Sequence, residues 1–405
     1  MQGLSKKILQ EKLILNIVKD YEPVSRVKIR KFTDMRLATI TEITKNLIDN
    51  GIIRETGDDP DIGNKRKKLL YIHKERYYVV GAEISTDRIL VILTDLKGNI
   101  LQQSEKEIRS DYPYQHILDI LNSIIRNLIA EYKKEQLLGI GISNPGRVDK
   151  EKGESVFSSQ LEKWSNVPLK SIIGKEFGLP VYLGNNSETG IFAESWFGEA
   201  RNIKDVIYMH VGAGISINII SNNSLIKGYA GVTGEIGHNI VIPNGNLCTC
   251  GNFGCLQTVA SSKVLVRNIV NILEKGASSM VADLVDGDVS KVSIGTIIEA
   301  AKRNDKIALS ILDDAGEYVG IALSNAVNLI GPQMIILGGE IIKNNTYILN
   351  TIIRTLQKNV LPVIYKDIKV KTTSFPDNES ALGAVAIVLD EFYMRSKLKD
   401  YDLLD

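Results

Sequence analysis

The chain has 405 residues, of which 44% are hydrophobic and 24% charged, and its formal net charge is +1. This composition indicates a folded globular protein long enough for two or three domains. The net charge near zero argues against a protein that covers nucleic acid with a uniformly basic surface. Because no N-terminal apolar leader and no apolar span of about 18 residues is present, the sequence also argues against a membrane protein. We therefore expect a cytoplasmic protein without a membrane partner.

Charge is distributed unevenly along the chain. Residues 1–75 hold 16 Lys and Arg against 11 Asp and Glu, a net charge of +5, whereas the remainder holds 33 against 37, a net charge of −4. A basic head on an acidic body indicates that the N-terminal part binds nucleic acid.

The head has the pattern of three helices and a hairpin. Apolar residues recur at helical spacing over residues 4–19, Ser25 is placed to cap a second helix, and a third is predicted over residues 36–50. Two short strands then flank the basic segment 63–68. This order predicts a winged helix-turn-helix domain over residues 1–75; the alternative is a helical protein-binding module with a solvated basic loop.

In such a domain the third helix enters the major groove and the wing contacts phosphates or the minor groove. The residues predicted to face DNA are those on the polar side of the third helix and at the wing: Arg36, Thr39, Thr41, Glu42, Lys45, Lys65, Arg66 and Lys67. Glu42 is unusual there, because a carboxylate repels phosphate, although it can accept a hydrogen bond from a cytosine amine.

The body alternates short strands with apolar-periodic helices, which predicts α/β lobes. Two similar three-strand patterns, each at the start of a lobe, indicate a duplication; they cover residues 78–84, 88–96 and 100–108, then 206–211, 215–221 and 225–227. Long helices are predicted over residues 117–129 and 315–330.

Polar residues follow three further predicted strands. These strands are residues 137–143, 181–184 and 334–337, followed by polar segments 144–149, 185–188 and 338–340. Ligands of such sheets bind in loops beyond the strand ends. Any one of these loops taken alone is also compatible with an ordinary turn; together they predict one polar cleft suited to a polyhydroxy ligand.

All three cysteines lie in one segment with a histidine: His238, Cys248, Cys250 and Cys255. One imidazole and three thiolates form a closed tetrahedral set, typical of structural zinc. The alternatives are three inert buried thiols, or a disulfide with one cysteine left over. Glu235 lies three residues before His238, so one helical turn would turn both side chains the same way.

The GEIGH and CxCGxxGC motifs of this segment resemble the signature of the ROK family, which comprises sugar kinases and sugar-responsive repressors related to xylose repressors. The resemblance covers essentially the whole chain. It implies an actin-like, ribonuclease-H-like α/β body and structural Zn²⁺ on His238 and the three cysteines. It also implies sugar contacts from Glu235 and His238. Gln257 stands where the family usually has Glu.

The resemblance also suggests domain boundaries. We predict a winged helix-turn-helix domain at 1–75, a first lobe at 76–188 completed by a C-terminal helix at about 387–405, and a second lobe at 189–386 with the zinc loop.

The chain departs from the pattern of the family's kinases at the groups that catalyse transfer. Those kinases carry Asn-Asp before the second lobe, and the Asp is the general base, whereas this chain has Asn185-Asn186. An amide takes no proton near neutral pH, and losing a general base costs roughly 10²–10⁴-fold in rate. Their Asp-x-Gly-Gly-Thr phosphate loop is replaced by residues 83–87, Glu-Ile-Ser-Thr-Asp, and Ser216 replaces a glycine of the second loop. We predict that the chain is not an enzyme.

The resulting hypothesis is a sugar-responsive DNA-binding regulator, most simply a repressor of carbohydrate-utilisation genes. Its predicted partners are operator DNA and a sugar effector in the inter-lobe cleft, and its predicted assembly is a homodimer or a dimer of dimers. The predicted sugar contacts are Asn185, Asn186, Glu235, His238 and Gln257. The alternatives are an ATP-dependent sugar kinase with a DNA-binding head, and a regulator controlled by a sugar-transport protein.

Overall fold

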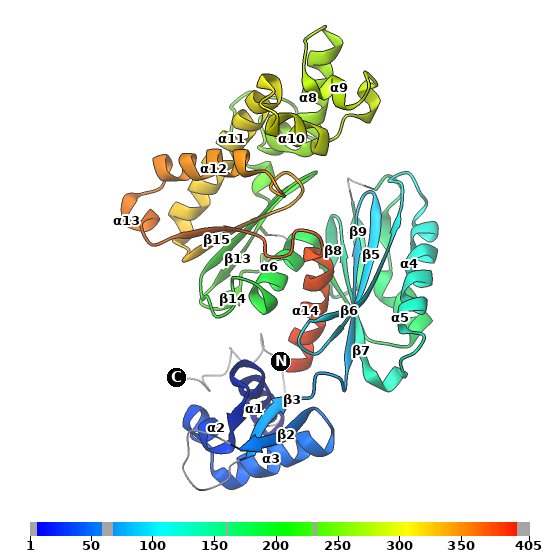
Figure 1. Ribbon diagram of the computed structural model, residues 1–405, viewed down its shortest axis with the longest axis vertical. Helices are drawn as coiled ribbons and strands as arrows, with labels where there is room; N and C mark the ends of the chain where they lie inside the picture. The colour runs from blue at the N-terminus through cyan, green and yellow to red at the C-terminus, as the bar shows by residue number, and fades with distance from the viewer. Residues whose placement is uncertain (1–5, 59–67, 159–160, 230–232, 395–405) are drawn as a thin grey trace. The chain divides into compact units, whose positions relative to one another are not determined.

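The fold was analysed in a computed structural model, which describes residues 6–58, 68–158, 161–229 and 233–394 (Figure 1). Its described residues separate into two compact units. The first contains residues 1–192 and 380–405, and the second contains residues 193–379. The head and the first lobe therefore belong to one unit, which is described apart from the second lobe below.

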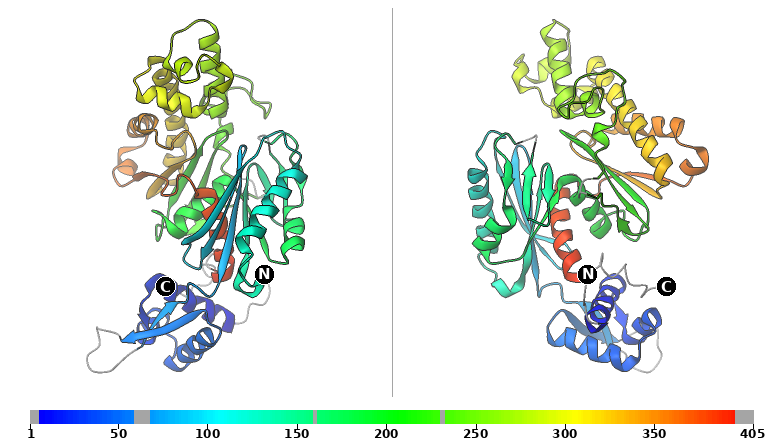
Figure 2. Two further views of the ribbon diagram at one scale, coloured as in Figure 1. Left: turned by 45° about the vertical axis from the view of Figure 1, so that its right-hand side comes forward. Right: turned by 180° about the vertical axis from the view of Figure 1, so that it is seen from behind.

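The head has the predicted helices and strands. They are α1 (Lys6–Tyr21), β1 (Val24–Ser25), α2 (Arg26–Thr33), α3 (Leu37–Asp49), β2 (Ile53–Asp58) and β3 (Lys68–Ile72), and the strands form a sheet in the order β1-β3-β2. Ser25 caps α2 as predicted, because its hydroxyl accepts a hydrogen bond from the Lys28 amide (3.4 Å). Figure 2 shows β2 and β3 as a hairpin beside the helices. The prediction of a winged helix-turn-helix domain is confirmed.

The first lobe is built on a five-stranded sheet with strand order β11-β7-β4-β5-β6. Its elements are β4 (Tyr78–Ile84), β5 (Arg88–Asp95), β6 (Ile100–Glu107), α4 (Tyr114–Ile129), η1 (Lys134–Gln136), β7 (Leu137–Asn144), β8 (Arg147–Asp149), β9 (Glu154–Phe157), β10 (Ser165–Val167), α5 (Leu169–Phe177), β11 (Val181–Asn185), the start of α6 (Asn186–Phe197) and most of α14 (Glu379–Tyr393). Strands β10, β9 and β8 form a separate small sheet in that order. Strands β4, β5 and β6 are antiparallel, while β4, β7 and β11 are parallel.

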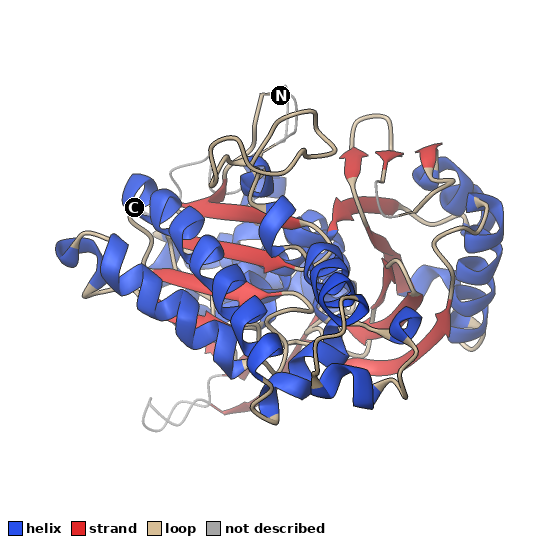
Figure 3. Cartoon of the chain, turned by 90° about the horizontal axis from the view of Figure 1, so that it is seen from above, coloured by secondary structure: helices blue, strands red, loops and turns tan. Residues whose placement is uncertain are grey.

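The second lobe repeats this arrangement with strand order β14-β13-β12-β15-β16. Its elements are β12 (Val206–Val211), β13 (Ile215–Ser221), β14 (Ser224–Leu225), η2 (Ile236–His238), α7 (Gln257–Ala260), α8 (Ser262–Glu274), α9 (Met280–Leu284), η3 (Val289–Lys291), α10 (Ile294–Lys302), α11 (Lys306–Ile330), β15 (Met334–Gly338), α12 (Thr346–Asn359), α13 (Pro362–Tyr365) and β16 (Lys369–Thr372). Helices lie along the strands of this sheet (Figure 3).

Both sheets thus consist of an antiparallel meander followed by two parallel strands, with the first strand of the meander paired to the first parallel strand. This repeated order is that of the ribonuclease-H-like fold, so the predicted actin-like architecture is confirmed. The main difference in element length is α11, which begins nine residues before the predicted 315. Asp305 caps its first turn by accepting from the Ala308 amide at 2.8 Å. No helix among the described residues has the length and apolarity needed to cross a membrane.

Candidate functional site

The predicted metal ligands converge in the second lobe. The ligand atoms of His238, Cys248, Cys250 and Cys255 all lie within 4.8 Å of one another. Cys248 Sγ is 3.6 Å from His238 Nδ1, and the sulfurs of Cys250 and Cys255 are 3.7 Å apart. Sulfurs bound tetrahedrally at about 2.3 Å from zinc are separated by about 3.8 Å, whereas a disulfide needs about 2.05 Å. All three cysteines are free, and the cluster has the dimensions to bind a metal ion.

The charges of the thiols also favour a cation. Burial opposes ionisation of the Cys248 thiol, but hydrogen bonds from Cys250, Gln257 and His238 together outweigh it and lower its pKa to about 6. Burial and, to a smaller extent, the neighbouring thiols of Cys248 and Cys250 together raise the pKa of Cys255 to about 12. Three thiolates so close together repel one another, and a divalent cation removes that penalty.

Glycines allow the metal loop to fold tightly. Gly254 has a φ of +75°, and a Cβ on it would lie 1.7 Å from the Ile242 carbonyl oxygen. The chain forms two short antiparallel bridges, Ile240 with Cys255 and Leu247 with Phe253, so the second and third cysteines return toward the first. This close approach is possible only without a side chain at Gly254.

Glu235 is the N-cap of the 3₁₀ turn η2 and His238 is its last residue, and residues three apart in such a turn lie on the same side. Glu235 is exposed and His238 half-buried. Gly234 and Gly237 seat the turn on β13, because a Cβ on either would collide with the carbonyl oxygens of Ile217 (1.7 Å) and Ile215 (2.4 Å).

The side chain of Gln257 is directed toward the metal ligands. Its amide nitrogen donates to Cys248 Sγ at 3.2 Å and to Thr249 Oγ1 at 3.4 Å. Glutamate, which the family usually has at this position, has no donor for such a bond. Donors to coordinating sulfurs orient metal ligands, so Gln257 has a role beside the metal set that the sequence did not indicate.

In the first lobe the predicted residues Asn185 and Asn186 lie at the junction of β11 and α6. Asn185 Oδ1 accepts from the Glu188 amide at 2.8 Å and from Ser187 Oγ at 3.1 Å, so it caps the helix. Asn186 Oδ1 accepts from Ser143 Oγ at 2.8 Å. The oxygen of Asn186 therefore already accepts one hydrogen bond, while its amide nitrogen is a donor suited to a hydroxyl ligand.

Three polar groups around this junction were not predicted individually. Ser143 Oγ lies 2.8 Å from Thr189 Oγ1 as well as from Asn186, which links β7 to α6. Asn144 is fully buried and donates to Ser155 Oγ at 2.9 Å, while its Oδ1 has no partner among the described residues. Lys150 is ion-paired with Glu188. Of the three, only Asn144 belonged to the polar segment predicted at residues 144–149; Ser143 and Lys150 had no sequence signal.

Acidic groups lie at both segments that were compared with the phosphate loops of the family's kinases. Burial raises the pKa of Glu83 to about 7, although Arg88 lies 3.7 Å away and opposes this. In the second lobe, Ser262 Oγ donates to Glu340 Oε1 at 2.6 Å beside Gly212, where a Cβ would lie 3.4 Å from that carboxylate oxygen. Carboxylates at both loops disfavour a polyphosphate by like-charge repulsion.

The DNA-facing residues predicted on α3 lie on its polar side. Ile40, Ile43 and Leu47 are buried, and the outward residues are exposed except for the half-buried Thr39: Arg36, Thr39, Thr41, Glu42 and Lys45. Lys7 Nζ is 3.2 Å from Glu42 Oε1, so the unusual carboxylate forms an exposed ion pair within the head. The predicted wing residues Lys65, Arg66 and Lys67 lie outside the described residues.

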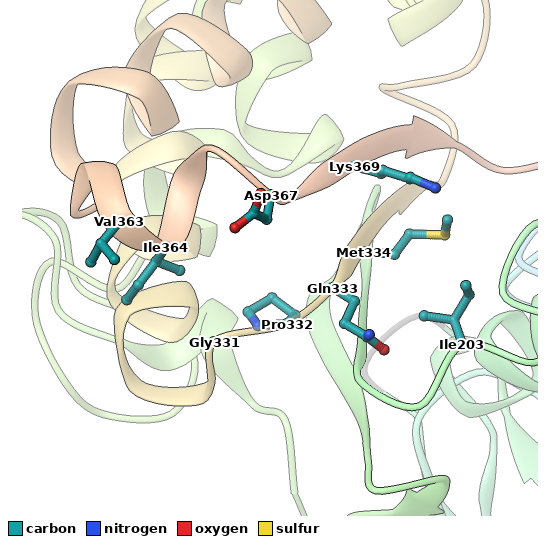
Figure 4. A pocket seen from close by; sticks show the side chains of 9 residues that line it. All are labelled: Ile203, Gly331, Pro332, Gln333, Met334, Val363, Ile364, Asp367 and Lys369. Atoms are coloured by element: carbon teal, nitrogen blue, oxygen red, sulfur yellow. The ribbon is translucent and has the colours of Figure 1, made fainter.

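A separate cavity of about 400 Å³ lies at the start of β15 (Figure 4). Its walls are mainly apolar side chains, among them Ile203, Pro332, Met334 and Val363. None of the predicted site residues lines it.

The head, the duplicated body and the His-Cys₃ loop define a two-lobed α/β protein with a DNA-binding-type head and a candidate metal site. The ROK family model matches residues 79–391, and the chain belongs to that family.

Similar proteins match the head as well as the body. The chain is 33% identical to the xylose repressor of Bacillus spizizenii over 393 residues, covering 96% of this chain and 97% of the relative. It is 30% identical to the xylose repressor of Caldicellulosiruptor bescii over 387 residues (95% and 96%). It is 28% identical to the transcriptional dual regulator NagC of Escherichia coli (94% and 92%).

Two solved structures are informative. A ROK family transcriptional regulator, a homolog of the E. coli MLC protein, has a TM-score of 0.81 at 25% identity and covers 97% of this chain and 99% of its own. A ROK glucokinase from Streptomyces griseus, in complex with glucose and AMPPNP, has a TM-score of 0.68 at 25% identity and covers 76% and 98%. The kinase is thus matched along its own length while leaving about a quarter of this chain uncovered.

Proposed function

We propose that the protein is a sugar-responsive transcriptional regulator that represses carbohydrate-utilisation genes. The observation that carries this proposal is the joining of a winged helix-turn-helix head to a sugar-kinase-like body whose general-base position is Asn186. The two relatives named xylose repressors match 95% and 96% of the chain, head included. Operator DNA is the partner of α3 and the wing, and the effector is a sugar.

The sugar is bound by polar groups from both lobes: Asn185, Asn186, Glu235, His238 and Gln257. Asn186 offers its amide nitrogen to a hydroxyl because its oxygen accepts from Ser143. Glu235 is exposed and offers a carboxylate acceptor on the same side of η2 as His238. Each lobe therefore contributes donors and acceptors of the kind that recognise a polyol.

Kinase activity is absent in this proposal. Asn186 has no proton-accepting group, and Glu83 and Glu340 lie at the loops that would bind phosphates. Replacing a general base alone lowers a rate roughly 10²–10⁴-fold. Asn186→Asp therefore does not create a kinase, because the acidic phosphate loops remain.

The metal at His238, Cys248, Cys250 and Cys255 is Zn²⁺, with a structural role. Four protein ligands close the coordination sphere, so the ion holds the loop bearing Glu235 and does not activate a water molecule. The regulator binds a palindromic operator as a homodimer or a dimer of dimers, since a two-fold protein matches repeated half-sites.

The test uses operator DNA selected from random duplexes by the purified protein. Fluorescence anisotropy with D-xylose, D-glucose and N-acetyl-D-glucosamine, and with the phosphate of each, is expected to show a sugar-dependent change in affinity. A coupled ATPase assay on the wild type and on Asn186→Asp is expected to show no sugar-dependent turnover. A protein that binds no selected DNA, or that phosphorylates a sugar at ordinary enzymatic rates, would overturn the proposal.

A further inference from the structure

The C-terminal end of α14 is held by the first helix of the head (Figure 1). Lys12 Nζ donates to the Phe392 carbonyl at 2.7 Å, and Asn16 Nδ2 donates to the Tyr393 carbonyl at 2.8 Å. The last four carbonyls of a helix have no partner within that helix. Lys12 and Asn16 thus supply, from α1, the hydrogen bonds that α14 lacks.

Aromatic contacts strengthen the same junction. Lys12 Nζ lies 4.7 Å from the centre of the Phe392 ring, and Lys19 Nζ lies 5.7 Å from that of Tyr393. Tyr393 and Asn16 are buried, and burial lowers the pKa of Lys12. An ordinary surface lysine keeps its ammonium group in water. The partial burial of the Lys12 ammonium group therefore indicates a specific contact with α14.

Along its length α14 packs on the first-lobe sheet at backbone distance. A Cβ on Gly141 of β7 would lie 2.0 Å from the Ala384 carbonyl oxygen, and one on Gly81 of β4 would lie 2.3 Å from the Ala381 oxygen. No flexible side chain separates the helix from the strands at these points. The helix therefore shifts only together with the neighbouring backbone, as expected for close-packed interiors.

Near its start α14 also contacts the helix that carries Asn186. A Cβ on Gly383 would lie 1.8 Å from the Thr189 carbonyl oxygen, so α6 and α14 touch through their backbones. Thr189 Oγ1 is bonded to Ser143, which in turn bonds Asn186. A continuous set of contacts thus joins the proposed sugar site to Gly383, then through α14 to Phe392 and Tyr393, and finally to α1.

We propose that α14 transmits sugar occupancy to the DNA-binding head, with Lys12 and Asn16 as the contact that receives the signal. The inference rests on the proposed function and adds its route of regulation. A sugar that forms a hydrogen bond with Asn186 displaces the first turn of α6. Because α6 contacts Gly383 through its backbone, α14 moves with it. The carbonyls of Phe392 and Tyr393, which are bonded to Lys12 and Asn16, then reposition α1. Couplings of this kind typically change affinity by about 5–150-fold.

The competing route is the connection between head and lobe near β3 and β4. There the Leu96 amide donates to the Lys74 carbonyl at 3.4 Å, and Lys97 is ion-paired with Glu22. If this connection sufficed, the contacts between α1 and α14 would be dispensable for the response. Variants at Lys12 and Asn16 separate the two routes.

The test compares Lys12→Met and Asn16→Leu in the full chain with Lys6→Met. Lys6 is an exposed residue on the same helix, so its substitution removes the same charge without the contact. The readouts are sugar affinity by calorimetry and operator affinity with and without the sugar that acts on the wild type. Both contact variants are expected to bind sugar within about threefold of wild type while the ratio of operator affinities falls to near one; Lys6→Met retains the wild-type ratio.

Contact variants that keep the wild-type ratio would overturn the route through α14 while leaving the proposed function intact. A wild-type protein that responds to no sugar would instead remove the proposed function, and the route with it. Hydrogen exchange tests the contact without any effector: Asn16→Asp places an acceptor against the Tyr393 carbonyl and is expected to speed exchange in both α1 and the last turn of α14. Unchanged exchange in both would also overturn the inference.

Discussion

The two lobes share one sheet topology but fix their candidate ligand groups in different ways. In the first lobe, Asn186 is positioned by hydrogen bonds among strand ends and the first turn of α6. In the second, His238 is positioned by a cluster of three thiols on a loop with only two short bridges. The first arrangement is therefore part of the lobe's core, whereas the second is a cluster on a loop outside the sheet, with the dimensions to bind a metal ion.

Removing the proposed zinc is expected to have the largest effect, and to change hydrogen exchange in the second lobe but not in the first. Structural zinc contributes about 10–16 kcal/mol of apparent binding free energy in small zinc-finger peptides. Cys248→Ser with Cys250→Ser should abolish binding of one zinc per chain, measured by elemental analysis, and speed hydrogen exchange around η2 but not around α6. Thr249→Ala, between the two cysteines, is the control and should retain the ion. Wild-type protein without metal, or equal exchange changes in both lobes, would contradict the comparison.

The packing of α14 offers a second test, confined to the first lobe. Gly141→Ala would place a methyl group 2.0 Å from the Ala384 oxygen, and overpacking typically costs about 1–3 kcal/mol. Gly174 in α5 is the control position, because the nearest atom to a Cβ added there would be 3.6 Å away. Gly174→Ala should therefore be neutral or stabilising, by up to about 1 kcal/mol. Urea denaturation measures both, and equal effects would show that the close helix–sheet contact is absent.

Glu83 makes the stability of the first lobe pH-dependent. Burial raises the pKa of Glu83 to about 7 in the folded protein, above the ordinary value of 4.5. The folded state therefore binds this proton more tightly than the unfolded state, which stabilises the fold at acidic pH. That stabilisation is lost as pH rises through about 7. Glu83→Gln should therefore unfold at a higher urea concentration than wild type at pH 8 and at the same concentration at pH 4. A difference that is the same at both pH values would show that Glu83 ionises normally.

The smallest effect is expected in the head, at the exposed pair of Lys7 and Glu42. Exposed ion pairs contribute about 0–1 kcal/mol, so Glu42→Gln should leave the free energy of unfolding almost unchanged. It should strengthen binding to selected operator DNA, because a negative charge is removed from the predicted DNA-facing side of α3. Asp49→Gln, which removes a charge at the end of the same helix, is the control. Weaker binding by Glu42→Gln would indicate that Glu42 reads a base.

Much of this molecule could be predicted from local patterns. Apolar runs gave the bounds of β4 and β12 without error, because both strands are buried on both faces and so are apolar along almost their whole length. The clustering of His238, Cys248, Cys250 and Cys255 could be predicted because three of the four lie within eight residues of one another, and the fourth belongs to a recognisable motif. Ser25 was identified as a helix cap because capping needs only a hydroxyl and the next turn.

Other features were invisible in the sequence. The hydrogen bond from Ser143 that occupies Asn186 Oδ1 joins residues 43 apart, and that from Asn16 to Tyr393 joins residues 377 apart. Neither has a local signature, because a serine on a strand or an asparagine on a helix has many possible partners. The direction of the Gln257 side chain could not be predicted for the same reason. Its amide points toward Cys248 because the folded loop brings the sulfur there.

The sequence alone thus determined the types of element and their order, and it identified the cluster of His238 with the three cysteines, since each follows from residues close together in the chain. Only the tertiary structure decided that Glu83 is buried enough for its pKa to rise, that glycines bring α14 onto the sheet, and that α1 caps the end of α14. These depend on distances between segments far apart in the chain, which composition and periodicity do not encode.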